Sequence, residues 1–207
     1  MRVQSGISRR HMLTMTAAAT GLSIGGNLGG ALAQSGKRIE RFAPELDNII
    51  STSEPIRDFN SGTGGPGGPT EGPVWFKEGG YLLFSDIFHD RRMKYTPGQG
   101  VTVFKEKTNR ANGMTRDLQG RLVAAERDTR RVTRQEADGS LTVIANSFQG
   151  KRLNITNDVV VKSDGAIYFT DPKRSSEPEP WDVAHTGVYR VSPDLGTVTL
   201  LVDVFAR

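Results

Sequence analysis

The sequence predicts an all-β fold of the β-propeller class, because a four-strand pattern with similar turns recurs three times in it. The copies begin at Glu71, Asn112 and Asn157, so that they start 41 and 45 residues apart. A repeat of this length that contains two strand pairs is typical of a propeller blade. We therefore expect about three four-stranded blades, at about 71–106, 112–146 and 157–203.

The first strand pair of each copy is apolar, and a turn that contains Gly and Asp interrupts it in the second and third copies. Each pair begins with a polar residue and ends in an acidic residue. The pairs lie at 71–75 and 81–86, at 112–115 and 121–126, and at 157–161 and 166–171. Each copy therefore begins with two predicted strands joined by a turn.

The second strand pair of each copy alternates in polarity and encloses a turn of Pro, Asp, Ser or Gly residues. These pairs lie at 92–95 and 101–104, at 131–134 and 141–144, and at 188–191 and 198–201. The turn residues favour tight connections between antiparallel strands. An ordinary antiparallel sandwich is the alternative, but it gives no reason for a whole four-strand pattern to repeat. The extra length at 172–186 predicts a rim loop.

The first 33 residues have the pattern of a twin-arginine signal peptide. Arg9 and Arg10 precede a mild apolar stretch, and the small residues at 31 and 33 form a cleavage site that leaves Gln34 as the new first residue. The stretch is short and rich in glycine, so we expect no membrane span in the mature chain. These features predict a periplasmic or secreted protein of a bacterium. Residues 34–70 are expected to form an N-terminal segment and a Gly/Pro loop, and 71–207 the partial propeller.

Charge and cysteine content exclude several kinds of function. The chain has 27 Lys and Arg against 23 Asp and Glu, and three of the arginines lie in the signal segment, which contains no acid. The mature chain is therefore nearly neutral, and we expect no nucleic-acid partner. The absence of cysteine excludes disulfides, thiolate chemistry and Cys-bound zinc. The sequence does not define the oligomeric state.

Three polar residues lead the first strands of the three copies. The innermost strands of a propeller line its central channel, so Glu71, Asn112 and Asn157 are expected to converge. A carboxylate and amide oxygens form a hard ligand set, which suits Ca²⁺, Mg²⁺ or Mn²⁺. The alternative for Glu71 is a carboxylate that caps backbone amides, and for the asparagines it is a role in turns.

The motifs closely resemble those of the senescence-marker-protein/gluconolactonase/luciferin-regenerating-enzyme family. The resemblance covers about residues 70–203 and includes TEGPVW at 70–75, YLLFSDI at 81–87, ANGMT at 111–115 and NDVVVKSDG at 157–165. It implies a six-bladed propeller that hydrolyses sugar lactones with one divalent cation in its channel. Since only about three blades are present, the chain is expected to be a C-terminally truncated form of a longer protein.

The resemblance also implies roles for individual residues. It makes Glu71 and Asn157 metal ligands, and Asn112, Asn157 and Asp158 residues that bind or support the substrate. Calcium is the expected ion, with Zn²⁺, Mn²⁺ or Mg²⁺ as alternatives. The family's general-base aspartate is expected beyond Arg207, so no catalytic residue is assigned. Thr156 stands where many members have proline.

The predicted function is metal-dependent hydrolysis of a sugar lactone to the aldonic acid, impaired here because later metal ligands are missing. The alternatives are an inactive fragment or a propeller that only binds, and a phosphotriesterase-type hydrolase on the same scaffold. We further expect Trp75 in the core of a blade, and Asp86 and Asp171 bound to backbone in the blade turns. His89 and His185 are expected to be solvated loop residues.

Overall fold

The computed structural model describes residues 38–57, 70–173 and 181–204, which fall into two compact units divided between Arg57 and Asp58. The signal segment, the Gly/Pro loop and part of the 172–186 insertion lie outside the described residues. In the first unit the 3-10 helix η1 (Pro44–Asn48) follows an extended Ala43 and buries none of its residues. Proline suits the first turn of a helix because its missing N–H would be unpaired there.

Three four-stranded antiparallel sheets make up the second unit, and in each the strands pair in chain order. The first sheet contains β1 (Thr70–Phe76), β2 (Tyr81–Asp86), β3 (Arg91–Thr96) and β4 (Gly100–Glu106). The second contains β5 (Ala111–Arg116), β6 (Leu122–Glu126), β7 (Arg131–Gln135) and β8 (Leu141–Ala145). The third contains β11 (Val159–Val161), β12 (Ile167–Asp171), β13 (Gly187–Val191) and β14 (Val198–Val202). A short pair, β9 (Ser147–Phe148) and β10 (Lys151–Arg152), lies between the second and third sheets in the chain.

This arrangement confirms the predicted fold class, an all-β chain with three propeller-type sheets. The repeat extends to irregularities, because the pairing of the third and fourth strands shifts register near the same point in all three sheets. The shifts lie between Arg92 and Met93, between Val132 and Thr133, and between Val188 and Tyr189. A bulge adds local twist to a strand pair, so its recurrence indicates that the three sheets share one geometry.

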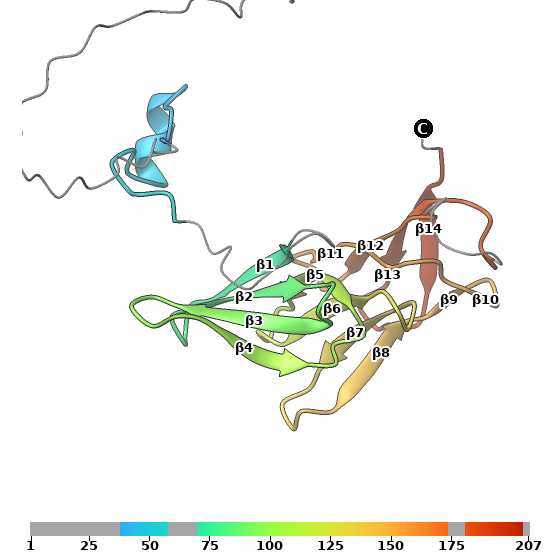
Figure 1. The fold of residues 1–207 in the computed structure, drawn as a ribbon. Coiled ribbons are helices and arrows are strands. Elements are labelled where there is room, and N and C mark those ends of the chain that lie inside the picture. Colours follow the sequence, from blue (N-terminus) through green and yellow to red (C-terminus); the bar gives the residue numbers. More distant parts are fainter. Residues whose placement is uncertain (1–37, 58–69, 174–180, 205–207) are drawn as a thin grey trace, which may run out of the picture. The chain divides into compact units, whose positions relative to one another are not determined.

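The sheets pack face to face through side chains that alternate along β6. Leu122 and Ala124 join the core between the first and second sheets, with Leu83 and Met114. Val123 and Ala125 point the other way and join a core whose other residues include several of the third sheet. A strand with both faces buried explains why the run 122–125 is apolar throughout. Figure 1 shows the three sheets adjacent to one another, with β1, β5 and β11 as neighbours.

The prediction that Trp75 belongs to the core of a blade is wrong for the described structure. Its neighbours Val74 and Phe76 pack against the core of the first two sheets, and Trp75 itself is 48% exposed. Because successive side chains of a strand point to opposite faces, Trp75 lies on the face turned away from the second sheet. The bulge between Glu71 and Val74 sets this parity, and Gly72 and Pro73 are a sequence signal from which the bulge could have been predicted.

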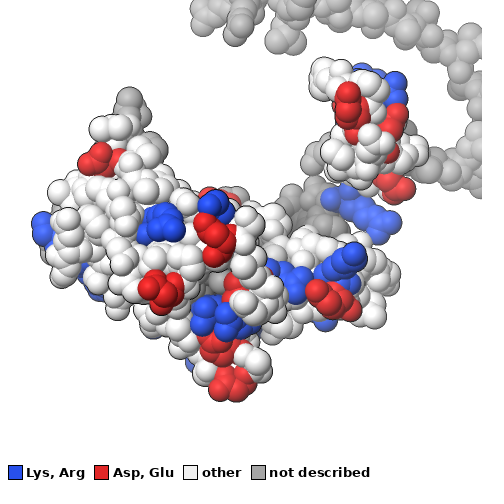
Figure 2. Space-filling view, turned by 180° about the vertical axis from the view of Figure 1, so that it is seen from behind, with Lys and Arg blue, Asp and Glu red and all other residues white. Residues whose placement is uncertain are grey.

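On the face that Figure 2 presents, Lys and Arg lie beside Asp and Glu in small mixed groups. This distribution agrees with the near balance of charge in the sequence. Among the described residues, no helix is both long and apolar enough to cross a bilayer.

Candidate functional site

The first strands of the three sheets bring the predicted polar residues close together. Asn112 lies on β5, which neighbours both β1 and β11. Its Nδ2 donates a hydrogen bond of 2.7 Å to Oδ1 of Asn157, which precedes β11. The backbone N–H of Gly113 donates to the carbonyl of Asn157, also at 2.7 Å. The start of the second sheet is therefore bound to the start of the third through both side chain and backbone.

Glycine after the leading polar residue lets these strands approach so closely. At Gly72, whose φ is +56°, a Cβ would lie 2.3 Å from the carbonyl oxygen of Asn112. At Gly113 a Cβ would lie 2.4 Å from Oδ1 of Asp158 and 2.7 Å from its Cα. Neither position has room for a side chain, so each glycine seats its strand against the next. This contact places Glu71, which precedes Gly72, beside the Asn112 backbone.

Glu71 is half-buried on β1, opposite Ser85 in the register of the first sheet. Within the described residues, no hydrogen bond reaches its carboxylate. The alternative role of Glu71, a carboxylate that caps backbone amides, therefore has no support among the described residues. Ser85 donates its own hydrogen bond, of 2.7 Å, to the carbonyl of Asn112. Among the described residues, the Glu71 carboxylate therefore has no partner that would compete with a ligand.

The two asparagines and Asp158 form a chain of hydrogen bonds. Nδ2 of Asn157 donates to Oδ2 of Asp158 at 3.2 Å, while its Oδ1 accepts from Asn112. The backbone N–H of Asp158 donates to Oγ1 of Thr170 on β12. Since a carboxylate only accepts and Asn112 donates, both ends of the Asn157 amide have a defined orientation.

Asn112 also has an unused acceptor. The residue is 3% exposed, and its Oδ1 is buried without a hydrogen-bond partner in the described structure. Buried polar atoms nearly always have partners, so an orphaned oxygen calls for a donor or a cation. Together with the Glu71 carboxylate and the second lone pair of Asn157 Oδ1, the starts of the three sheets offer three oxygen-bearing side chains as candidate metal ligands.

These donors fit a hard divalent cation but form a small set. No group of three or more His, Cys, Asp or Glu side chains able to hold a metal occurs within 38–57, 70–173 and 181–204. One carboxylate and two amide oxygens carry a formal charge of only about −1, whereas calcium takes about six to eight oxygen ligands. The site suits an oxygen-preferring ion, and these residues alone would bind it weakly.

A second repeated motif lies at the end of the second strand of each sheet. The last residue of each second strand is a fully or almost fully buried acid, namely Asp86, Glu126 and Asp171. The register sets Asp86 opposite Arg91 and Glu126 opposite Arg131, and each arginine Nε donates to its acid, at 2.9 Å and 2.8 Å. Acid and arginine lie five residues apart in both copies, and this spacing is a sequence signal from which the two ion pairs could have been predicted.

The third sheet breaks this pattern because Gly187 lies opposite Asp171, where the other sheets have arginine. Asp171 accepts a 2.7 Å hydrogen bond from the backbone N–H of Asn154, which agrees with its predicted backbone role. Its Oδ1 has no partner among the described residues. Burial raises the pKa of Asp171 to about 7, and the Asn154 amide and the charge of Arg130 only partly oppose this rise.

The remaining predicted residues have structural contacts. Asp86 contacts two side chains, because His89 Nδ1 lies 2.9 Å from its Oδ1 and Arg91 Nε donates to its Oδ2. The expectation of backbone contacts did not include these partners. The imidazole of His185 contacts Tyr189 on β13, with Nε2 3.0 Å from the hydroxyl, and the two rings stack with centroids 6.3 Å apart. Both histidines therefore have specific partners, and the expectation that they are simply solvated is incomplete.

Thr156 has a larger role than the loss of a proline suggests. The residue is fully buried, and its Oγ1 lies 2.9 Å from the carbonyl of Glu126 and 3.0 Å from that of Arg131. Proline at this position would have no hydroxyl to offer these carbonyls. Thr156, the residue before Asn157, is thus bound to the second sheet. This contact depends on the packing of two sheets, which the sequence does not reveal.

Comparison with known proteins supplies independent information. A family model described as the SMP-30/gluconolactonase/LRE-like region matches residues 69–206. A gluconolactonase of Zymomonas mobilis is 33% identical over 175 residues, which are 76% of this chain and 48% of the relative.

Solved structures agree with this match. A gluconolactonase structure from Xanthomonas campestris is 36% identical, with a TM-score of 0.60 over 65% of this chain and 48% of the other. A putative gluconolactonase is 28% identical, with a TM-score of 0.68 over 80% of this chain and 57% of the other. The chain therefore spans about half the length of these relatives.

Proposed function

Because the chain belongs to the SMP-30/gluconolactonase/LRE-like family, we propose that its first strands carry part of a site for the metal-dependent hydrolysis of a sugar lactone. The observation that carries this proposal is the hydrogen bond from Asn112 to Asn157. It joins two of the predicted polar residues beside the strand that bears Glu71. The relatives named gluconolactonases support the choice of a lactone as the substrate.

Glu71 and Asn157 are the residues proposed to hold the divalent cation, with Ca²⁺ as the first choice. A bound ion of this kind polarises a carbonyl and stabilises the negative charge that develops on its oxygen. Asn112 directs the Asn157 amide by donating to its oxygen, and Asp158 fixes the other end of the same amide. The exposed Asp158 carboxylate is also suited to accept hydrogen bonds from the hydroxyl groups of a sugar lactone.

The general base is left unassigned within residues 1–207. Proton transfer from the attacking water needs a carboxylate next to that water, and Glu71 is proposed as a ligand instead. We therefore propose weak cation binding and impaired hydrolysis for this chain. A rate of lactone hydrolysis above the uncatalysed rate would distinguish a lactonase from a propeller that only binds, because only a lactonase accelerates the opening of the lactone.

Two measurements on the 207-residue chain test the proposal. Calorimetric titration with Ca²⁺, Mn²⁺ and Zn²⁺ is expected to show binding that Glu71→Gln weakens and that Glu78→Gln leaves unchanged. Glu78 is a suitable control because it is exposed and pairs with Arg116. Hydrolysis of gluconolactone is then compared with and without a chelator, alongside an organophosphate substrate. Hydrolysis that neither the chelator nor Glu71→Gln alters would contradict the metal role.

A further inference from the structure

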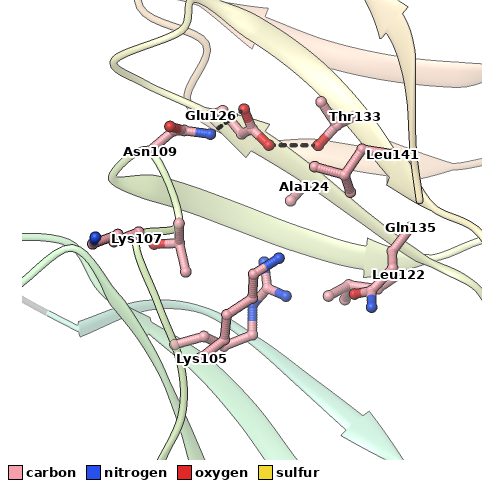
Figure 3. Close-up of a pocket in the computed structure, with 11 residues that line it drawn as sticks. Lys105, Lys107, Asn109, Leu122, Ala124, Glu126, Thr133, Gln135 and Leu141 are labelled. Carbon is pink, nitrogen blue, oxygen red and sulfur yellow. Dashed lines mark hydrogen bonds between the residues drawn. The ribbon is translucent and has the colours of Figure 1, made fainter. Parts of the chain in front are cut away.

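A small cavity lies between the first and second sheets and shares no residue with the candidate site. It has a volume of about 40 Å³, and residues of β3, β4, β6, β7, β8 and the 107–109 connection line it. Figure 3 shows Glu126 with its partners Asn109 and Thr133, and Lys105 and Lys107 at other points around the pocket. The hydrogen-bond donors and acceptors around this cavity indicate what it can hold.

Arg92 is the unusual residue of this cavity. It is 6% exposed, its Nε is buried without a hydrogen-bond partner, and no other described residue pairs with its guanidinium. Burial lowers the pKa of Arg92 to about 10, against the opposing effect of Glu126, so the group stays charged at neutral pH. A buried charge without a partner is costly, which indicates that something else in the cavity compensates it.

Glu126 attracts Arg92 through its charge, but its hydrogen bonds go to other donors, so it compensates Arg92 only in part. Oε1 accepts from Thr133 at 2.9 Å. Oε2 accepts from Asn109 at 2.9 Å, Thr129 at 2.6 Å and Arg131 at 2.8 Å. These donors include the Arg131 guanidinium, which forms an ion pair with Glu126, and no hydrogen bond joins Glu126 to Arg92 among the described residues.

Two of the other polar side chains around Arg92 are also cations. Lys105 and Lys107 carry ammonium groups, and Gln135 carries an amide that can both donate and accept. Within the described residues none of these three side chains makes a hydrogen bond or an ion pair. Thr108 donates to Asp90 instead. The cavity therefore combines three positive charges with one carboxylate, which already forms an ion pair with Arg131.

We propose that this cavity binds a small inorganic anion, a halide or an oxyanion, held by Arg92 with Lys105 and Lys107. A water molecule needs roughly 10–15 Å³ of such a volume, so about 40 Å³ holds about three waters or one small anion. A cavity of this size cannot enclose a whole sugar, a nucleotide or a peptide carboxylate with its side chain. The anion would join the first two sheets by neutralising Arg92.

Thermal unfolding of the 207-residue chain tests the proposal. Bromide or sulfate is titrated at constant ionic strength against glutamate, which is too large for the cavity. We expect a saturable rise of the melting temperature, by about 5–10 °C near 100 times Kd. Arg92→Met is expected to abolish the saturable part and Lys105→Gln to weaken it, while Lys151→Gln, an exposed lysine on β10, serves as the control. Sulfate stabilises most proteins without binding, and this general effect remains in every variant.

Anomalous diffraction from crystals soaked in bromide gives a direct readout that does not depend on the variants. A bromide peak beside Arg92 supports the proposal, even if Arg92→Met fails to fold. A cavity that contains only water in the soaked crystals would overturn it. An anion response of the same size in the wild type and in Arg92→Met would also overturn it.

Discussion

Asn112 donates a hydrogen bond of 2.7 Å to Asn157, a residue 45 positions later in the chain that leads the next sheet. Each asparagine occupies the same place in its own copy of the repeat. Their contact therefore depends on the packing of neighbouring first strands rather than on local structure. The bond orients the Asn157 amide and so sets the direction in which its Oδ1 faces a cation.

Replacing Asn112 is expected to weaken cation binding in two ways, because it removes the buried Oδ1 of Asn112 and the donor that orients Asn157. Asn112→Leu keeps a similar volume but cannot donate to Asn157, so only the hydrogen bond to Asp158 still orients that amide. Loss of a residue that orients a ligand typically reduces metal affinity by about 10- to 100-fold, and calorimetric titration with Ca²⁺ measures this change. Asn146→Leu, in the segment after β8, is the control, and equal affinities for both variants would contradict the proposed role.

Gly113→Ala is expected to destabilise the second unit. The new Cβ would lie 2.4 Å from Oδ1 and 2.7 Å from Cα of Asp158, so backbone has to move. Such overpacking costs about 1–3 kcal/mol, which urea unfolding measures. Gly196→Ala is the matched control, because its Cβ meets nothing closer than 3.4 Å. Equal stabilities of the two variants would show that the first strands are not packed as described.

The strands and their order could be predicted well from the sequence, because both depend on local patterns. Alternating runs and turn residues located all twelve strands of the three sheets. The exposure of Trp75 was missed, since a bulge before Val74 reverses the facing of the strand. The Arg92 cavity was also missed, because it depends on how residues of two sheets meet. The convergence of Asn112 and Asn157 was predicted from the repeat, whereas their direct bond required coordinates.

Thr156→Val is expected to lower stability by about 1 kcal/mol, the usual value of one hydrogen bond. Valine keeps the shape of threonine but cannot donate to either of the carbonyls of Glu126 and Arg131. Urea unfolding measures the difference in free energy. Thr197→Val, on the turn before β14, controls for the general effect of the substitution, and a stability equal to the wild type would contradict the role of the hydroxyl.

We propose that the N-terminal segment directs export through the twin-arginine route, as the sequence predicts. Replacing both Arg9 and Arg10 by lysine is expected to keep the chain in the cytoplasm at its full length. The unaltered chain is expected in the periplasm, beginning at Gln34. Cell fractionation and mass spectrometry of the recovered protein measure both features, and export of the doubly substituted chain would contradict the proposal.

The stability of the chain is expected to depend on pH through Asp171. Burial raises the pKa of Asp171 from 3.8 to about 7, so the folded state binds its proton more tightly than the unfolded state. The contribution of Asp171 is therefore fully present below about pH 4 and is lost as the pH rises through about 7. Asp171→Asn mimics the protonated acid, so its stability relative to wild type should increase over that window, by a few kcal/mol in order of magnitude.

Asp138→Asn is the matched control for this pH dependence. Hydrogen bonds from Ser140 lower the pKa of that exposed acid, so Asp138 stays ionised in the folded chain across the same window. The difference between Asp138→Asn and wild type should therefore change little above about pH 5, where this carboxyl is ionised in the unfolded chain as well. Urea unfolding between about pH 4 and 8 measures both differences, and a flat difference for Asp171→Asn would show that burial does not hold the proton on this carboxyl.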